Sequence, residues 1–139
     1  MLIGEYSHSL DAKGRVNFPS RLREDLGEHF ILAKGLDRCL FVYSLEEWGN
    51  LEKKIRELPM SKAGALQRFF FSGAIDVTVD KQGRIIIPQN LREYAGLDRD
   101  IMIIGASSRA EIWNKDAWQA SCEALTPEMI AAAMEDIGF

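Results

Sequence analysis

The sequence predicts an α+β protein made of two copies of one β-rich unit, with helices between the copies and after the second. Three observations indicate this class. The stretch SLDAKGRVNFPSRLRE, residues 9–24, recurs as TVDKQGRIIIPQNLRE, residues 78–93. Short apolar runs bounded by turn residues surround each stretch, which is typical of strands. Helix-capping patterns occupy much of the remaining chain.

The repeat indicates how the two copies are arranged. Seven positions are identical at an offset of 69, where Asp11, Gly14, Arg15, Pro19, Leu22, Arg23 and Glu24 match Asp80, Gly83, Arg84, Pro88, Leu91, Arg92 and Glu93. A unit of roughly 40 residues rarely buries enough apolar surface to fold alone. We therefore expect the copies to bury each other about a local twofold axis, which would bring their equivalent turns to one face.

The first copy begins with two strands on either side of a turn. The pattern predicts strands at 6–10 and 15–18 and a turn at 11–14. Pro19 stops the second strand and suits the first turn of a short helix over 20–26, which Gly27 ends. Strands at 30–33 and 40–43 complete the copy.

The second copy repeats this order of elements. Its turn is expected at 80–83, and its helix starts after Pro88 and ends at Gly96. Its strands are expected at 74–79, 84–87, 101–104 and 110–113.

A helical bridge joins the copies. Ser44 followed by Glu47 is the capping-box pattern of a helix, and Pro59 closes that helix. Ser61 is expected to cap a second helix. The aromatic run 69–71 has helical spacing, which predicts a buried face rather than a ligand site.

The end of the chain is expected to be helical and acidic. Asn114 can cap one helix, and Thr126 with Pro127 opens a last one. Residues 111–139 hold one lysine against six acidic residues, whereas residues 1–110 hold 16 Lys and Arg against 15 Asp and Glu. The net charge of −4 therefore comes from the tail, and a basic surface requires folding or assembly to gather arginines.

Composition argues against several classes of protein. No apolar run approaches the roughly 20 residues that span a bilayer. Residues 1–10 lack a signal-peptide pattern, so we expect a cytoplasmic protein. Cys39 and Cys122 are far apart and predict packed thiols rather than a disulfide or a zinc site. No metal and no cofactor are predicted.

The repeated turn has the residues to hold one shape. Asp11, and Asp80 in the second copy, can accept hydrogen bonds from backbone amides two or three residues later. Gly14 and Gly83 allow the positive φ that a tight turn needs, and a glycine lets a ligand approach the backbone closely.

The strand after each turn sends alternate side chains to opposite faces. Arg15 and Asn17 share one face of the first copy. In the second copy Arg84 matches Arg15, but Ile86 replaces Asn17, so we expect that face to be partly buried. We therefore expect Arg15 to contribute more to the binding of a ligand at this face than Arg84 does.

Residue types alone leave two interpretations of the turn open. Each aspartate can pair with the arginine four residues later merely to brace a hairpin. Alternatively, a rigid turn with cationic tips and free amides suits phosphate or a DNA groove. The second interpretation predicts a DNA-contact face made of Lys13, Gly14, Arg15, Lys81, Gln82, Gly83 and Arg84. Asp11 and Asp80 would shape the turns.

The doubled motif also carries a resemblance to a known family. The D-x-x-x-R element, each time followed by Pro-x-x-Leu-Arg-Glu, resembles the MraZ family of bacterial transcriptional regulators, whose domains are of the AbrB type. The resemblance covers nearly the whole chain, including the segments VYSLEEW and EIWNKDAW that close the copies. Ala110 stands where the family pattern suggests a larger residue, outside the DNA motif.

This resemblance implies a fold and a function. The fold is a duplicated swapped-hairpin (double-split) β-barrel, with copies at 5–48 and 74–118, a helical bridge at 49–73 and a helical tail at 119–139. The implied function is sequence-specific binding by ring-shaped homo-oligomers to double-stranded promoter DNA. The target would be short direct repeats upstream of the division and cell wall gene cluster, including the protein's own gene, on the nucleoid.

Two other classes of function are weighed against this one. An enzyme is disfavoured, because Ser7, His8 and Asp11 alternate along a strand and cannot form a triad by adjacency. No phosphate-loop, H-E-x-x-H or G-x-S-x-G motif occurs. An antitoxin-like or scaffolding use of the same barrel stays open, although the capped last helix differs from a disordered toxin-binding tail.

Overall fold

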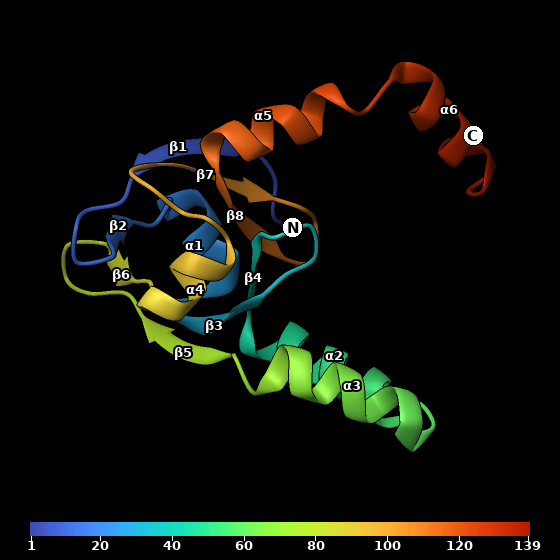
Figure 1. The fold of residues 1–139 in the computed structure, drawn as a ribbon, viewed down its shortest axis with the longest axis horizontal. Helices are drawn as coiled ribbons and strands as arrows, with labels where there is room; N and C mark the ends of the chain where they lie inside the picture. The colour runs from blue at the N-terminus through green and yellow to red at the C-terminus, as the bar shows by residue number, and fades with distance from the viewer.

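Two antiparallel sheets, one large and one small, form the body of the molecule in a computed structural model that describes all 139 residues (Figure 1). The small sheet pairs β2 (Arg15–Asn17) with β6 (Arg84–Ile86). The large sheet runs in the order β1 (Glu5–Ser9), β7 (Asp100–Gly105), β8 (Ala110–Asn114), β4 (Leu40–Tyr43), β3 (His29–Lys34) and β5 (Ile75–Thr78). The α+β class is as predicted.

The strands that flank each turn pair with the other copy rather than with each other. β1 pairs with β7, β5 pairs with β3, and β2 pairs with β6. The pairing of β4 with β8 lies at the middle of the large sheet, so the strand order is unchanged when the copies are exchanged. This crosswise pairing is the swapped arrangement that the resemblance implied.

The main core lies between the two sheets and the short helices α1 (Ser20–Leu26) and α4 (Gln89–Tyr94). Val16 and Ile85, which face each other in the small sheet, are both buried. Leu22 of α1 and Leu91 of α4 are buried beside them. Because both copies supply the inward side chains, each copy covers apolar surface that the other would otherwise expose.

A second, aromatic core lies under the helical bridge, α2 (Leu45–Arg56) and α3 (Met60–Phe71). Phe70 is buried there, with its ring centroid 6.4 Å from that of Phe41. Phe69 and Phe71 pack against the same cluster. The prediction that the aromatic run forms a buried face is confirmed.

Three of the four residues predicted to cap the N-terminus of a helix do so. Ser44 Oγ accepts a hydrogen bond from Glu47 N at 3.1 Å. The side chains of Asn114 and Thr126 cap α5 (Lys115–Glu123) and α6 (Pro127–Glu135) in the same way. The prediction for Ser61 is wrong. Helix α3 begins at Met60, two residues earlier than a cap at Ser61 would place it, directly after Pro59, whose φ of −56° already suits a helix start.

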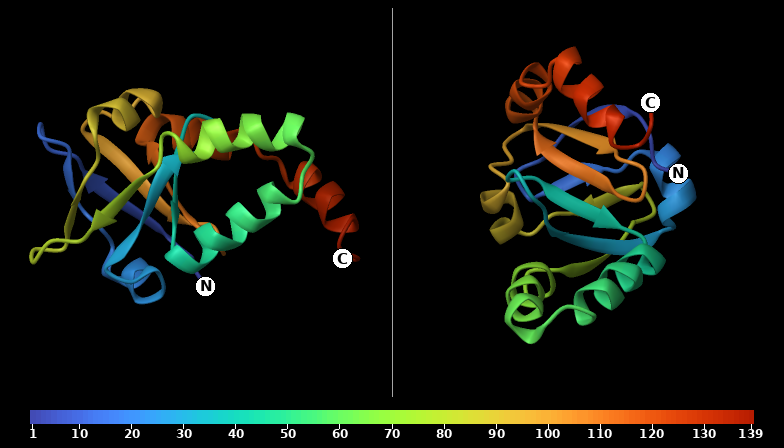
Figure 2. Two further views of the ribbon diagram at one scale, coloured as in Figure 1. Left: turned by 90° about the horizontal axis from the view of Figure 1, so that it is seen from below. Right: turned by 90° about the vertical axis from the view of Figure 1, so that its right-hand side faces the viewer.

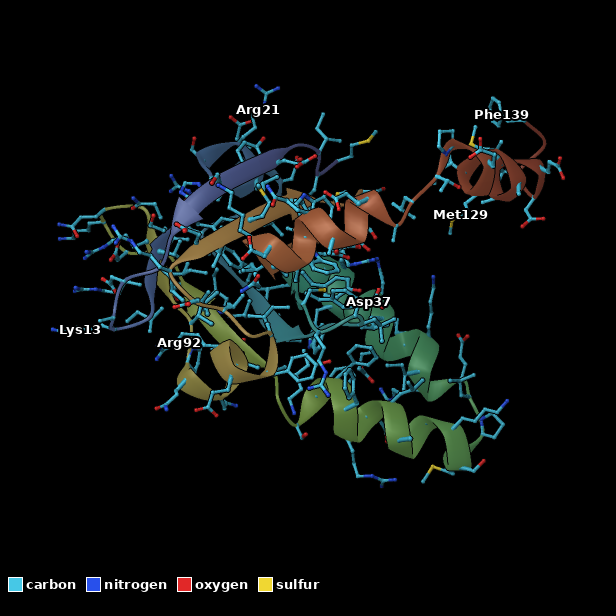
Figure 3. The ribbon with its side chains drawn as sticks, turned by 45° about the horizontal axis from the view of Figure 1, so that its top comes forward. Lys13, Arg21, Asp37, Arg92, Met129 and Phe139 are labelled. Carbon is cyan, nitrogen blue, oxygen red and sulfur yellow. The ribbon has the colours of Figure 1, made fainter.

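The helical arms and the turns lie at opposite ends of the molecule. The far end of the α2–α3 hairpin and helix α6 extend away from the body, whereas α5 lies against β7 and β8 (Figures 1 and 2). Lys13, on the first turn, and Phe139, at the chain end, mark the two extremes (Figure 3). Helix α6 is exposed along its whole length, including the apolar side chains of Met129 and Ile130. No helix has both the length and the apolar character needed to cross a membrane.

Candidate nucleic-acid interface

The two repeated turns project from the same end of the body, and their tips diverge (Figures 1 and 2). The short β2–β6 ribbon joins them. Two further backbone hydrogen bonds extend the ribbon, from Phe18 N to Gly83 O at 2.9 Å and from Ile87 N to Gly14 O at 2.8 Å. The motif that occurs twice in the sequence therefore forms one composite surface.

An aspartate holds each turn in the same shape. Asp11 Oδ1 accepts hydrogen bonds from the amides of Lys13 and Arg15, both at 2.9 Å. Asp80 Oδ1 repeats this with the amides two and four residues later, at 2.8 and 2.9 Å. The glycines before each arginine have φ of +83° and +79°, as the turn requires. Carboxylate and glycine together fix where the arginine leaves the turn.

Each arginine is braced through one nitrogen only. Arg15 Nε donates to Asp11 Oδ2 at 2.7 Å, and Arg84 Nε donates to Asp80 Oδ2 at 3.1 Å. The terminal Nη nitrogens of both arginines make no hydrogen bond within the chain, and about a third of each side chain is exposed. The brace foreseen for a hairpin therefore exists and leaves the outer part of the guanidinium group available to a ligand.

The same hydrogen bonds keep the aspartates ionised. The Arg15 amide and the Arg15 guanidinium lower the pKa of Asp11 to about 2. Hydrogen bonding from the Arg84 amide lowers the pKa of Asp80 in the same direction. Both carboxylates stay charged at neutral pH and hold the arginine side chains in place.

Gly14 has an internal role that sequence reasoning missed. It is buried, and a Cβ placed on it would lie 2.6 Å from the Ile87 carbonyl oxygen. Arg92, from the second copy, packs over the same turn and donates from Nε to Ile87 O at 2.9 Å. The Pro-x-x-Leu-Arg segment of the repeat was the signal for this contact, because its arginine braces the turn of the other copy.

The equivalent contact at the second turn is looser. A Cβ placed on Gly83 would meet only the flexible end of Arg23, at 3.5 Å. Arg23 pairs with Glu28 at 3.2 Å, and its Nε is buried without a hydrogen-bond partner. The two turns have the same backbone shape but unequal surroundings.

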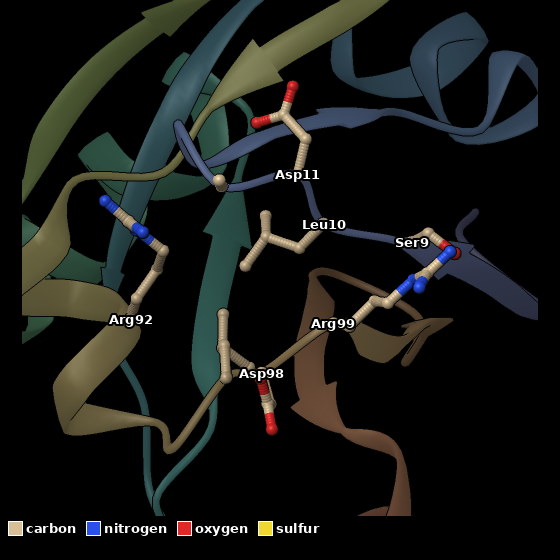
Figure 4. A pocket seen from close by; sticks show the side chains of 8 residues that line it. Ser9, Leu10, Asp11, Arg92, Asp98 and Arg99 are labelled. Atoms are coloured by element: carbon tan, nitrogen blue, oxygen red, sulfur yellow. The ribbon is translucent and has the colours of Figure 1, made fainter.

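A pocket of about 540 Å³ lies behind the first turn (Figure 4). Arg92 and Arg99 line it together with Asp11 and Asp98. The two positive and two negative groups balance each other, so the pocket does not select ligands by charge.

The outward face of the ribbon carries four side chains. Arg15 lies opposite Ile86, and Asn17 lies opposite Arg84. Ile86 is 61% exposed, so the prediction that its face is partly buried is wrong. Strand alternation places Ile85 and Ile87 in the core and leaves Ile86 outside.

The residues considered for catalysis have separate partners. Asp11 is engaged by its own turn and Arg15. Ser7 Oγ lies 3.4 Å from Lys115 Nζ on α5. His8 is partly buried, which lowers its pKa and favours the neutral form. The structure contains no cluster of three or more His, Cys, Asp or Glu side chains suited to a metal.

Comparison with known proteins identifies the family. A model of the MraZ protein family, described as antitoxin-like, matches residues 1–68 and again residues 70–137. The chain belongs to the MraZ family. Each of the two consecutive MraZ matches contains one copy of the repeated turn, so the resemblance stated from the sequence is confirmed.

MraZ relatives match the chain from end to end. Proteins named "Transcriptional regulator MraZ" from Acetivibrio thermocellus and Caldicellulosiruptor saccharolyticus are 59% and 57% identical to it, over 100% of this chain and 100% of theirs. One from Clostridium botulinum is 52% identical over the same shares. The solution structure of a Pyrococcus horikoshii protein, 18% identical with a TM-score of 0.33, covers 81% of this chain and 88% of its own, and is too distant to inform the fold.

Proposed function

We propose that this protein is a sequence-specific, DNA-binding transcriptional regulator. The contact surface would be formed by Lys13, Arg15, Lys81, Gln82, Gly83 and Arg84, with the buried Gly14 acting through the shape of the first turn and with Asp11 and Asp80 shaping both turns. The observation that carries the proposal is the β2–β6 ribbon, which places both cationic turns at one end of the molecule and carries the partly exposed side chains of Arg15 and Arg84. The names of the relatives support the regulatory role.

The ribbon suits the major groove of B-form DNA. A two-stranded β-ribbon fits that groove, and an arginine that presents two donors can pair with O6 and N7 of guanine. Arg15 and Arg84 have unpaired Nη nitrogens for such contacts. Lys13 and Lys81 are exposed at the turn tips, where they can reach phosphates on either side of the groove.

The proposed target is a set of short direct repeats in the promoter of the division and cell wall gene cluster, which includes the protein's own gene. Few cationic groups project from one chain, so useful affinity requires several subunits on spaced repeats. A ring-shaped homo-oligomer would supply them, and the exposed apolar side chains of α6 support assembly. The protein would act in the cytoplasm, associated with the nucleoid.

Replacing each turn arginine with alanine tests the proposal. Arg56→Ala is the matched control, because Arg56 also pairs with one acidic residue, Glu52 at 3.3 Å, but lies on α2 far from the turns. Loss of a base-reading arginine should cost about 1–3 kcal/mol per site. Loss of a phosphate contact should lower the slope of log K against log salt by about one. Binding is titrated at two salt concentrations on promoter and scrambled DNA.

Melting curves show whether a binding defect comes from a lost DNA contact or from a destabilised fold. We expect Arg15→Ala and Arg84→Ala to melt as the wild type does, because an exposed ion pair contributes only about 0–1 kcal/mol. If Arg15→Ala unfolds while its folded fraction binds the promoter fully, the arginine is a brace and the proposed site is wrong.

The second candidate is an antitoxin-like or scaffolding oligomer, which the description of the family model favours. It predicts that wild type and Arg15→Ala bind promoter and scrambled DNA equally. A clear preference of the wild type for the promoter would reject it.

A further inference from the structure

The outward face of the ribbon is nearly symmetric, with one difference between the copies. Arg15 and Arg84 occupy equivalent positions on β2 and β6. The next outward positions hold Asn17 in the first copy and Ile86 in the second. The backbone frame is thus repeated, while one pair of equivalent side chains differs completely in chemistry.

Ile86 stands out among the side chains of this surface. It is 61% exposed, lies opposite Arg15 and follows Arg84 by two residues on the same strand. It also lines a pocket of about 350 Å³, whose other lining residues are apolar in three cases and polar or charged in four: Ile75, Val77, Pro88, Asp76, Thr78, Asp80 and Arg84. An apolar β-branched side chain in the middle of a cationic surface gains free energy only when a partner covers it.

We propose that Ile86 and Asn17 determine base specificity, with Ile86 contacting the 5-methyl group of a thymine and Asn17 hydrogen bonding to the edge of an adenine. This inference rests on the proposed function. In the major groove the thymine methyl is the apolar group on the base edges, and asparagine pairs with N6 and N7 of adenine. Both side chains lie on the ribbon face that would enter that groove.

The difference between the copies gives the recognised sequence a direction. Two identical copies related by a twofold axis would read the two strands of a symmetric site alike. Here one side of the ribbon offers an amide and the other an apolar side chain, so the preferred site has unlike ends. The double exchange Asn17→Ile with Ile86→Asn should therefore prefer the same bases in reversed order.

Single replacements of thymine by uracil test the methyl contact, because uracil lacks only that group. The probe is the promoter duplex upstream of the protein's own gene, with one thymine replaced at a time. We expect wild-type affinity to fall about fourfold for at least one replacement, the effect of one methyl group. The Ile86→Ala protein should bind that thymine and uracil duplex equally.

Two further variants complete the experiment. Leu36→Ala, at a residue equally exposed but outside the ribbon, should keep the wild-type response to uracil. Ile86→Ser also lacks the methyl groups of isoleucine and should likewise bind the thymine and uracil duplexes equally. The inference is overturned if wild type ignores every replacement, or if Ile86→Ala responds to uracil as wild type does. Absence of wild-type promoter binding would instead reject the proposed function.

Discussion

At the scale of single residues, the Asp11 carboxylate ties the backbone of the turn to the arginine it presents. Its pKa is lowered to about 2 by the Arg15 amide and guanidinium, against an ordinary value of 3.8. The stabilisation by this carboxylate is therefore fully present above about pH 4 and is lost as the pH falls through 2. We expect the Asp11 carboxyl resonance to titrate near pH 2 by NMR.

The Asp11→Asn variant is the control for this titration. It keeps an oxygen acceptor for the amides but cannot ionise, so its melting temperature should lack the Asp11 contribution between pH 4 and pH 2. An Asp11 carboxyl that titrates near 3.8 in the folded protein would show that the turn hydrogen bonds do not persist in solution.

Alanine substitutions at Gly14 and Gly83 can be compared to separate the cost of backbone strain from the cost of steric overlap. Their φ angles are +83° and +79°, so alanine is strained equally at both. Only Gly14→Ala places a Cβ against a backbone oxygen, the Ile87 carbonyl at 2.6 Å. We expect Gly14→Ala to lower the free energy of unfolding by about 1–3 kcal/mol more than Gly83→Ala, as measured by urea denaturation.

Equal losses in the two variants would contradict the close packing of the first turn against the second copy. The comparison also informs the DNA titrations, because it shows how much of any binding defect at Gly14 comes from a disturbed fold.

At the scale of elements, the sequence predicted well where helices and strands lie along the chain, but it predicted poorly which strands pair with each other. Proline and glycine placed α1 at residues 20–26, as the structure has it. Alternation predicted which side chains of β2 point inward, but a period of two does not say which strand lies alongside. The resemblance implied a swapped-hairpin barrel, but the pairing of β2 with β6 was not predicted. Ile86 was misjudged because its apolar character suggested burial, whereas its position between the buried Ile85 and Ile87 leaves it on the exposed face.

The crosswise pairing predicts that neither half of the chain folds alone. Residues 1–58 keep only the pairing of β3 with β4, and they lack β7, β6, β5 and β8, which pair with β1, β2, β3 and β4. We expect this fragment to show no cooperative thermal transition by circular dichroism as a monomer. Mixing it with residues 59–139 should restore one, because the missing strands are then supplied.

Sedimentation velocity provides the control, since it distinguishes a monomer from a dimer in which the fragment pairs with itself. A folded, monomeric fragment 1–58 with a sharp melting transition would show that the copies do not depend on each other.

At the scale of the whole molecule, two unlike ends face in opposite directions. The turns carry the cationic tips, and the far end carries the acidic tail with its apolar α6. The whole of α6 is exposed in the single chain, so removal of residues 126–139 should leave the melting temperature of the body nearly unchanged. We expect the truncated protein to have a lower mass by light scattering, because association loses its apolar surface.

The double substitution Met129→Ser with Ile130→Ser is a milder form of the same test and keeps the length of the chain. A truncated protein with the same mass as the full chain, at the same concentration, would show that assembly uses other surfaces.

The covalent bridge between the copies has a consequence for dilution. Two separate half-length chains could interleave in the same way, but they would dissociate when few molecules are present. The α2–α3 segment between β4 and β5 makes the pairing intramolecular, so the pairing does not depend on the concentration of the protein. The paired turns therefore form within a single chain, even when a cell contains few molecules of the protein.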